Sequence, residues 1–445
     1  MFTVTMTAEW LVWVSALAAV LHGRSAWRLA HVFTGILLAS GRRTASSWWR
    51  AARVGDRFRS YYYFLDSVGR KVRAMAAVLV TIVLRRIDLG DRLVFALDDT
   101  PTKRYGPKVQ GAGIHHNPTP GPAGAKFLYG HSWVVLSRVV RHASFGLISL
   151  PLLALIYIRK KDIALLPPSA VLEFQTKVEQ AADLARWLRA QLPANAPPAW
   201  IVVDGGYAKR VFLKAAKRER FVVVARLRRD AALFDLPPVV PPGQKRGRGR
   251  PPIYGKNRIS LVKRAGQGRG WQTVEVHTNT GEAVTKQVKS FLATWQPAGG
   301  VVRVVIIKED DGSWRACLCT HPEASVEAIV QVVVDRWGIE QSFHDLKEVE
   351  KIEQVQLRRL WANVGALNLN LWAHTLTEVW AWSRSAAQLV DREPWDDHER
   401  RPSHADRRRA LQREMLDQEF RRLPVPGPWR AKILNLLAIV LKLAA

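Results

Sequence analysis

Three charged side chains in the segment Asp335–Lys347 have a spacing that suits metal and phosphate chemistry. Arg336, Glu340 and Lys347 follow one another at intervals of four and seven residues. In an α-helix Glu340 and Lys347 then lie only about 40° and 20° around the axis from Arg336, so all three share one face. A neighbouring face carries an apolar stripe that can pack against a core, formed by Ile339, Phe343 and Leu346. A carboxylate held between two cations on an anchored helix suits a site that binds metal ions and phosphates.

The same pattern is also typical of a solvated salt-bridge ladder, worth about 0.2–0.5 kcal/mol per pair. Two further carboxylates favour the interpretation as a metal and phosphate site over a salt-bridge ladder. Asp98 follows the apolar run Arg92–Leu97, and Asp204 follows Trp200–Val203. We therefore expect both at the carboxyl ends of buried strands, where α/β folds place their sites. Either aspartate taken alone is equally explained as a turn former.

The elements around these acids indicate an α/β fold. In chain order we expect three strands (92–97, 130–136 and 145–150), a helix (170–192), a strand (200–203), a helix (207–218) and a strand (221–226). The helix with Glu340 follows. The interval between Asp204 and Glu340 is too long for the last strand and helix alone, so it must contain an insertion. Alternating apolar and polar residues in that interval predict that the insertion is β-rich.

Together these motifs resemble those of bacterial insertion-sequence transposases of the DDE type. The matching parts are Leu97–Thr100, Val203–Tyr207, and Arg336, Glu340 and Lys347. The last three fit the family signature Y-x2-R-x3-E-x6-K, except that Val333 stands in place of the tyrosine. The resemblance covers roughly residues 89–371. It implies a ribonuclease-H-like mixed sheet flanked by helices, with an inserted β subdomain.

The resemblance also implies that Asp98, Asp204 and Glu340 are the catalytic, metal-binding acids, and that the cofactor is a pair of Mg²⁺ or Mn²⁺ ions. Such hard cations prefer carboxylate oxygens. Two of them can activate a water on one side of a phosphodiester and stabilise the leaving oxygen on the other. Asp99 competes with Asp98 for the first position. We prefer Asp98 because it directly follows the strand, which leaves Asp99 to a turn or to capping at Thr100.

Charge indicates the partner. Lys and Arg number 67 against 38 Asp and Glu, a net charge of +29, which indicates a polyanionic partner, most often nucleic acid, with a membrane surface as the competing explanation. The resemblance implies that this partner is double-stranded DNA. The predicted DNA contacts are Arg336 and Lys347 beside the acids, Arg42, Arg43 and Arg50 near the N-terminus, and Arg246, Arg248 and Arg250 in a basic loop. The N-terminal arginines belong either to a helix-turn-helix-like module or to a plain helical domain whose aromatic residues form its core. The basic loop either enters an A·T minor groove, like an AT-hook, or contacts phosphates only.

The chain divides into five predicted parts. They are a helical DNA-binding domain at 1–88, the first part of the catalytic core at 89–227, the β-rich insertion at 228–322, the catalytic helix with the helix after it at 323–375, and a helical C-terminal region at 376–445. Arginines of the C-terminal region, such as Arg407 and Arg408, are explained equally by a solvated face, a dimer contact or DNA binding. We expect a homodimer in the active complex.

Several features argue against a membrane or secreted protein. The longest apolar runs fall short of the roughly 20 residues of a spanning helix, and we interpret Trp10–Leu21 as a buried helix. Cys317 and Cys319 are too few for a four-ligand zinc site or a disulfide framework. We therefore expect a cytoplasmic, nucleoid-associated protein.

The sequence thus predicts a transposase that cleaves insertion-sequence ends and transfers strands into target DNA. Two alternatives are a ribonuclease-H-like nuclease or recombinase without strand transfer, and an inactive DNA-binding relic.

Overall fold

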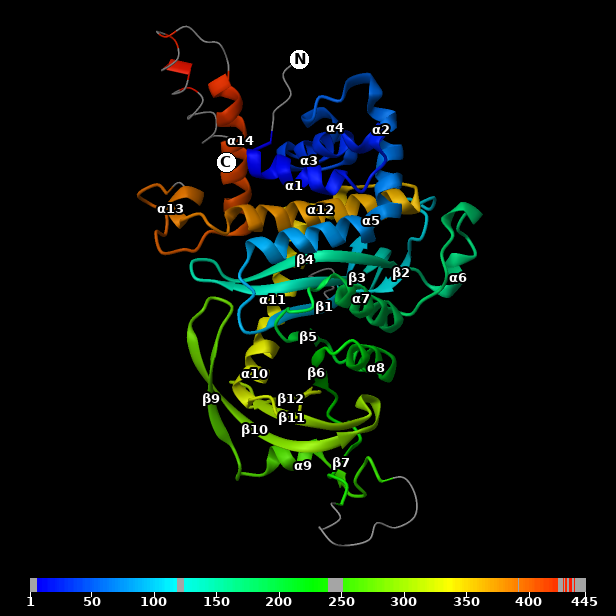
Figure 1. Cartoon of the computed structure of the whole chain (residues 1–445), viewed down its shortest axis with the longest axis vertical. Coiled ribbons are helices and arrows are strands. Elements are labelled where there is room, and N and C mark those ends of the chain that lie inside the picture. The colour runs from blue at the N-terminus through cyan, green and yellow to red at the C-terminus, as the bar shows by residue number, and fades with distance from the viewer. Residues whose placement is uncertain are drawn as a thin grey trace.

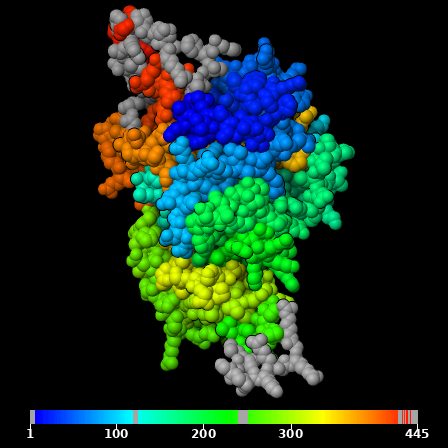
Figure 2. Space-filling model, viewed as in Figure 1, coloured from blue at the N-terminus to red at the C-terminus, as the bar shows by residue number. Residues whose placement is uncertain are grey.

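A single mixed β-sheet runs through the molecule, with helices packed on it and a helical region at one end (Figures 1 and 2). The computed structural model describes residues 6–117, 124–238, 251–390 and 392–422, with isolated residues beyond 426. Twelve strands of the described residues form the sheet, whose main path is β2-β3-β1-β5-β6-β12-β11-β10-β7-β8, with β4 on β3 and β9 on β10. The prediction of a mixed α/β fold with flanking helices is confirmed.

The strands predicted around the acids are present. They are β1 (Leu93–Lys103), β3 (Phe127–His142), β4 (Gly146–Tyr157), β5 (Ala199–Val203) and β6 (Val222–Leu227), with β2 (Gly113–His116) at the end of the path. Strands β1, β5 and β6 are parallel, whereas β3 is antiparallel to both β1 and β4. The carboxyl ends of β1, β5 and β6 therefore meet at one edge.

Strand β1 is longer than the sequence predicts. Pairing with β3 continues as far as Lys103, whereas pairing with β5 stops at Leu97 opposite Val203. The prediction that this strand ends at Leu97 is therefore wrong, and Asp99 lies within β1 and not in a turn. Asp98 is instead the first residue of β1 that lies beyond the end of β5.

The helices around the sheet differ from the prediction at their starts. Helix α7 (Lys177–Gln191) begins seven residues later than expected, because Thr176 and Glu179 form a capping box there. Helix α8 is Arg210–Arg218, and a short helix α6 (Lys160–Ile163) precedes α7.

The predicted helix with Glu340 is two helices. These are α10 (Val326–Asp335) and α11 (Trp337–Glu348), which meet at Arg336. Arg336 keeps helical dihedral angles (φ −55°, ψ −29°). The apolar stripe of α11 is buried, as predicted.

Strands of the predicted insertion extend the central sheet instead of forming a separate one. They are β7 (Leu233–Phe234), β8 (Arg258–Ile259), β9 (Gln272–His277), β10 (Ala283–Trp295), β11 (Gly300–Lys308) and β12 (Trp314–Cys319), with α9 (Leu261–Gly266) between them. Because β12 pairs with β6, the insertion is joined to the core by backbone hydrogen bonds.

Helices from both ends of the chain pack together above the sheet (Figure 1). They are α1 (Ala8–Ala18), α2 (Gly23–Ala26), α3 (Arg28–Leu38), α4 (Ala45–Ala51) and α5 (Phe58–Arg86) from the first part, and α12 (Leu360–Ala381), α13 (Ala386–Leu389) and α14 (His404–Arg422) from the last. Helix α1 confirms the predicted helix in this stretch, but only one face of it is buried, and Leu11 and Val12 are exposed. Helix α12 is buried along nearly its whole length, between α5 and β4. None of the described helices is long and apolar enough to cross a membrane.

Candidate active site

Asp98, Asp204 and Glu340 line one cavity of about 630 Å³, together with Arg336 and Lys347. The structure thus brings together the three acids and two of the cations that the sequence predicts at one site. Strand pairing explains the two aspartates, because Leu97 lies opposite Val203 and each aspartate is the next residue. Helix α11 brings the glutamate, since its apolar stripe packs against β4, β3 and β1.

Arg336 connects two of the acids. Its Nη1 donates to Asp98 Oδ2 at 2.8 Å, and its Nη2 pairs with Glu340 Oε1. Asp98 Oδ1 also accepts the backbone N–H of Asp99 at 2.8 Å. Burial raises the pKa of Asp98 from 3.8 to about 6, against the attraction of Arg336, and repulsion from Asp99 and Asp204 adds to the rise.

These residues fit a divalent metal ion. Six carboxyl groups line the cavity, those of the three predicted acids and those of Asp99, Glu348 and Glu353. Carboxylate oxygens are the ligands that Mg²⁺ and Mn²⁺ prefer. The raised pKa of Asp98 shows that Arg336 does not fully offset the burial of its charge. A cation at the acids would favour the ionised form of Asp98.

Asp99 also lines this cavity, but both of its carboxylate oxygens already have partners. Its Oδ1 accepts the hydroxyl of Tyr207 at 2.8 Å, and its Oδ2 pairs with Lys177 Nζ. Burial and the charge of Asp99 raise the pKa of Tyr207, so the phenol stays protonated as a donor. Asp99 thus links β1 to α7 and to the turn after Asp204. These contacts support Asp98 as the first acid.

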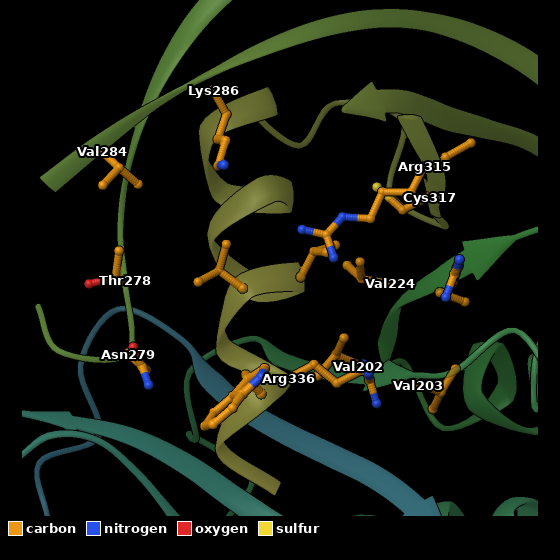
Figure 3. A pocket seen from close by; sticks show the side chains of 16 residues that line it. Val202, Val203, Val224, Thr278, Asn279, Val284, Lys286, Arg315, Cys317 and Arg336 are labelled. Carbon is orange, nitrogen blue, oxygen red and sulfur yellow. The ribbon is translucent and has the colours of Figure 1, made fainter. Parts of the chain in front are cut away.

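A second cavity of about 390 Å³ adjoins the first, because Arg336 lines both (Figure 3). Three other cations line it from separate strands, namely Arg226, Lys286 and Arg315. Lys286 is paired with the exposed Asp310 at 3.0 Å, and Arg315 with Glu309. Sequence reasoning missed these residues because only the pairing of β6, β12, β11 and β10 brings them together. Their charge can attract phosphates close to the acids.

The N-terminal DNA contacts predicted from the sequence have different surroundings. Arg42 and Arg50 are exposed. Arg43 is half-buried, and its Nη1 pairs with Glu350 Oε2 at 3.4 Å, so it is already used within the chain. Trp48 and Trp49 beside them are buried, as in a plain helical domain. Arg246, Arg248 and Arg250 lie outside the described residues.

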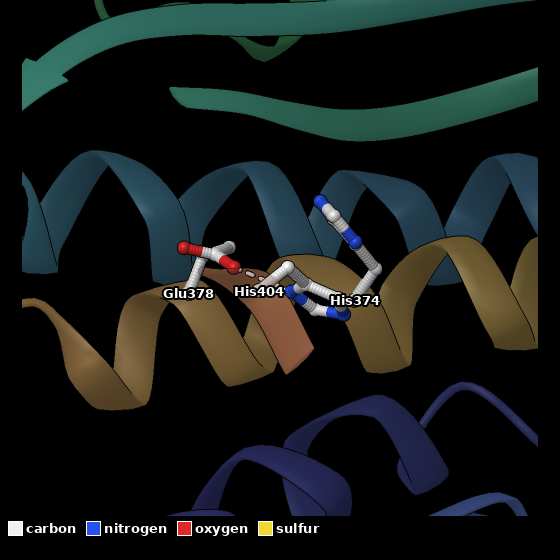
Figure 4. Close-up of side chains that lie close together, drawn as sticks. All are labelled: His374, Glu378 and His404. Carbon is white, nitrogen blue, oxygen red and sulfur yellow. Dashed lines mark hydrogen bonds and ion pairs between the residues drawn. The ribbon is translucent and has the colours of Figure 1, made fainter. Parts of the chain in front are cut away.

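A group of buried residues away from the acids also has metal-ligand types, namely His374, Glu378 and His404 (Figure 4). Their nearest ligand atoms lie within 4.8 Å of one another. However, both ring nitrogens of His404 already face carboxylates, Nδ1 that of Glu378 at 2.5 Å and Nε2 that of Glu350 at 3.1 Å. Burial lowers the pKa of His404, but these hydrogen bonds outweigh it and raise the pKa to about 9. A doubly protonated imidazole has no lone pair for a metal.

The same group includes two C-terminal arginines for which the sequence left three surface roles open. Both are buried. Arg407 Nε lies 2.7 Å from Glu378 Oε2, and Arg408 pairs with Glu350. Arg408 also donates to the backbone carbonyls of Ile36 at 2.6 Å and Leu37 at 2.8 Å. The group is therefore a buried ion network that ties α14 to α12, to the segment after α11 and to α3.

Comparison with known proteins identifies the family of the chain. The family model described as DDE superfamily endonuclease matches residues 16–291, a span that includes Asp98 and Asp204 and ends before Glu340. No curated protein matches the chain. Among solved structures, the chain is similar to piggyBac transposase in a cryo-EM synaptic complex with hairpin DNA, with a TM-score of 0.40 and 11% identity over 97% of this chain and 76% of that chain. Since the family model matches more than half of its residues, the chain belongs to the DDE superfamily endonuclease family.

Proposed function

We propose that this protein is a DNA transposase that cleaves DNA at the ends of an insertion sequence and transfers the cleaved strands into target DNA. The observation that carries the proposal is the meeting of Asp98, Asp204 and Glu340 in one cavity with Arg336 and Lys347. The strand order β4-β3-β1-β5-β6, with β1, β5 and β6 parallel, supports a ribonuclease-H-like core.

Asp98, Asp204 and Glu340 would hold two Mg²⁺ or Mn²⁺ ions, which supply Lewis-acid activation of a water and stabilisation of the leaving oxygen. The other residues bind and orient the DNA. Arg336 can offer its planar guanidinium to a phosphate, and Lys347 acts as a point charge on the same cavity wall. Burial lowers the pKa of Lys347, so phosphate binding there also favours its charged form.

Double-stranded DNA is the partner that the charge of +29 favours, both as the element end and as the target. Arg42 and Arg50 remain candidates for contacts with the element end, because both are exposed. We also infer that two copies act together, one on each end.

A cleavage and joining assay tests the proposal. The purified protein is incubated with Mg²⁺, a supercoiled target and a duplex that carries the inverted repeats flanking its genomic copy. We expect cleavage at the repeat ends and covalent joining to the target, and neither with Asp204→Asn. Cleavage without joining would indicate a nuclease or recombinase, and binding without cleavage would indicate an inactive relic.

A further inference from the structure

The outer face of α8 carries a concentration of positive charge that no role described above uses. Its exposed cations, here named the α8 basic face, are Lys209, Arg210, Lys214, Lys217 and Arg218. Within the part of the chain that the structure describes, none of their side chains forms an ion pair or a hydrogen bond. The opposite side of the helix is anchored, because Phe212, Leu213 and Ala216 are buried.

The α8 basic face begins beside the catalytic edge of the sheet. Tyr207, three residues before the helix, donates its backbone N–H to the carbonyl of Asp204 at 3.0 Å and its hydroxyl to Asp99 at 2.8 Å. The turn is therefore held at the acids, and α8 starts immediately after it. From Arg210 to Arg218 the helix rises about 12 Å. The green surface of this part of the chain lies on the visible face of Figure 2, uncovered by either terminus.

Stability of the helix does not explain these charges. A helix C-terminus favours cations, which accounts for Lys217 and Arg218. The N-terminus has the opposite preference, yet Lys209 and Arg210 stand there and the first turn contains no acidic residue. These two cations lower the stability of the helix at its N-terminus, so their presence there is not explained by helix stability.

The chemistry of the face selects one partner. Two copies of a face with five cations and no described ion pair would repel each other in a symmetric dimer. A membrane surface would require an apolar stripe among the charges, and Val211 is the one large apolar residue exposed on α8. A regular polyanion fits best, because duplex DNA carries one negative charge per about 1.7 Å of its axis.

We propose that the α8 basic face binds the sugar–phosphate backbone of duplex DNA that extends past the catalytic cavity. Phosphate contacts fix the position and direction of a duplex without reading its sequence. The face would thus set the path of the DNA beside Asp204. The choice of DNA rests on the proposed function, whereas the binding test below does not depend on catalysis.

The test compares two double variants with the same change of charge. One is Lys214→Gln with Lys217→Gln on α8. The control is Lys71→Gln with Arg85→Gln on α5, both exposed and, among the described residues, without an ion pair. Binding of a fluorescent duplex of arbitrary sequence is measured by anisotropy at salt concentrations from about 50 to 200 mM.

We expect the α8 variant to bind severalfold more weakly and to reduce the slope of log K against log salt by about 2, one for each lost phosphate contact. The control variant and Lys214→Arg with Lys217→Arg should keep the parent slope. A parent slope in the α8 variant would overturn the proposal. If the parent protein cleaves no DNA but the α8 variant still loses affinity, the proposed function is wrong and DNA binding by the α8 basic face is retained. If the parent protein cleaves DNA normally and the slope of the α8 variant is unchanged, only DNA binding by the α8 basic face is wrong.

Discussion

Nη1 of Arg336 lies 2.8 Å from Oδ2 of Asp98, which joins the start of α11 to the centre of β1. The same guanidinium pairs with Glu340, so one arginine supplies the positive charge between two acids. The pKa of Asp98 nevertheless rises to about 6, because burial outweighs this attraction. This relationship ties the charge of the site to pH and to bound metal.

Metal binding should therefore depend on the ionisation of Asp98. The pKa of this group is higher in the folded protein than the 3.8 of an exposed carboxyl. Without metal, its contribution to the free energy of unfolding is thus present below about pH 4 and is lost as pH rises through about 6. Metal binds the ionised form, so Mn²⁺ should raise the melting temperature more at pH 8 than at pH 5. In Asp98→Asn the added stability should be much smaller at both values; an equal rise at both in the parent would contradict this account.

The buried ion network should produce a second pH dependence of stability, at higher pH. The pKa of His404 is raised from 6.5 to about 9, because its hydrogen bonds to Glu350 and Glu378 outweigh burial. Its stabilising contribution is therefore complete below about pH 6.5 and is lost as pH rises through about 9. We expect the free energy of unfolding, measured with urea, to fall over this window more steeply in the parent than in His404→Gln. Parallel curves would show that the imidazole is not charged.

Removing one carboxylate of that network should lower the free energy of unfolding by a large amount. Glu350 pairs with His404, Arg408 and Arg43, and its side chain is 1% exposed. Glu350→Gln leaves buried cations without a counter-charge, a loss of about 3–5 kcal/mol in the free energy of unfolding. Glu348→Gln, two residues earlier and 59% exposed, is the matched control and should change it by less than about 1 kcal/mol. Equal effects would mean that the network contributes nothing specific.

The contact between α5 and α12 should tolerate no side chain at Gly69. A Cβ atom there would lie 1.8 Å from the backbone oxygen of Trp361. Gly69→Ala must push the two helices apart, so we expect a loss of about 1–3 kcal/mol or more in chemical denaturation. Gly23→Ala is the control, because a Cβ at that position meets nothing within 4 Å. A neutral Gly69→Ala would show that the helices are not in close contact.

The two aspartates could be located from the sequence because each follows an apolar run that forms a buried strand. The length of β1 could not be predicted from the sequence. Pro101 within it argues against a central strand, since proline lacks a backbone donor. The structure accommodates it because β5 has already ended, so Pro101 pairs with Ser132 of β3 on one side only.

The ion network could not be predicted for a different reason. Arg407 and Arg408 stand in a run of arginines, a pattern typical of a solvated surface. Their burial depends on Glu350 and Glu378, which come from other elements and meet them only in the folded chain. Local pattern carries no information about such distant partners. The cations of the second cavity were missed for the same reason.

The most direct test of the account is cleavage by Glu340→Gln, which keeps the size of the side chain but removes the charge that holds a divalent ion. We expect a folded protein that binds end-bearing DNA like the parent and whose Mg²⁺- or Mn²⁺-dependent cleavage falls by several orders of magnitude. Asp98→Asn and Asp204→Asn should behave alike, whereas Asp99→Asn should retain more activity, because Asp99 contacts Lys177 and Tyr207. Near-normal cleavage by Glu340→Gln would contradict the assignment of the three acids, and an inactive Asp99→Asn beside an active Asp98→Asn would move the first acid by one residue.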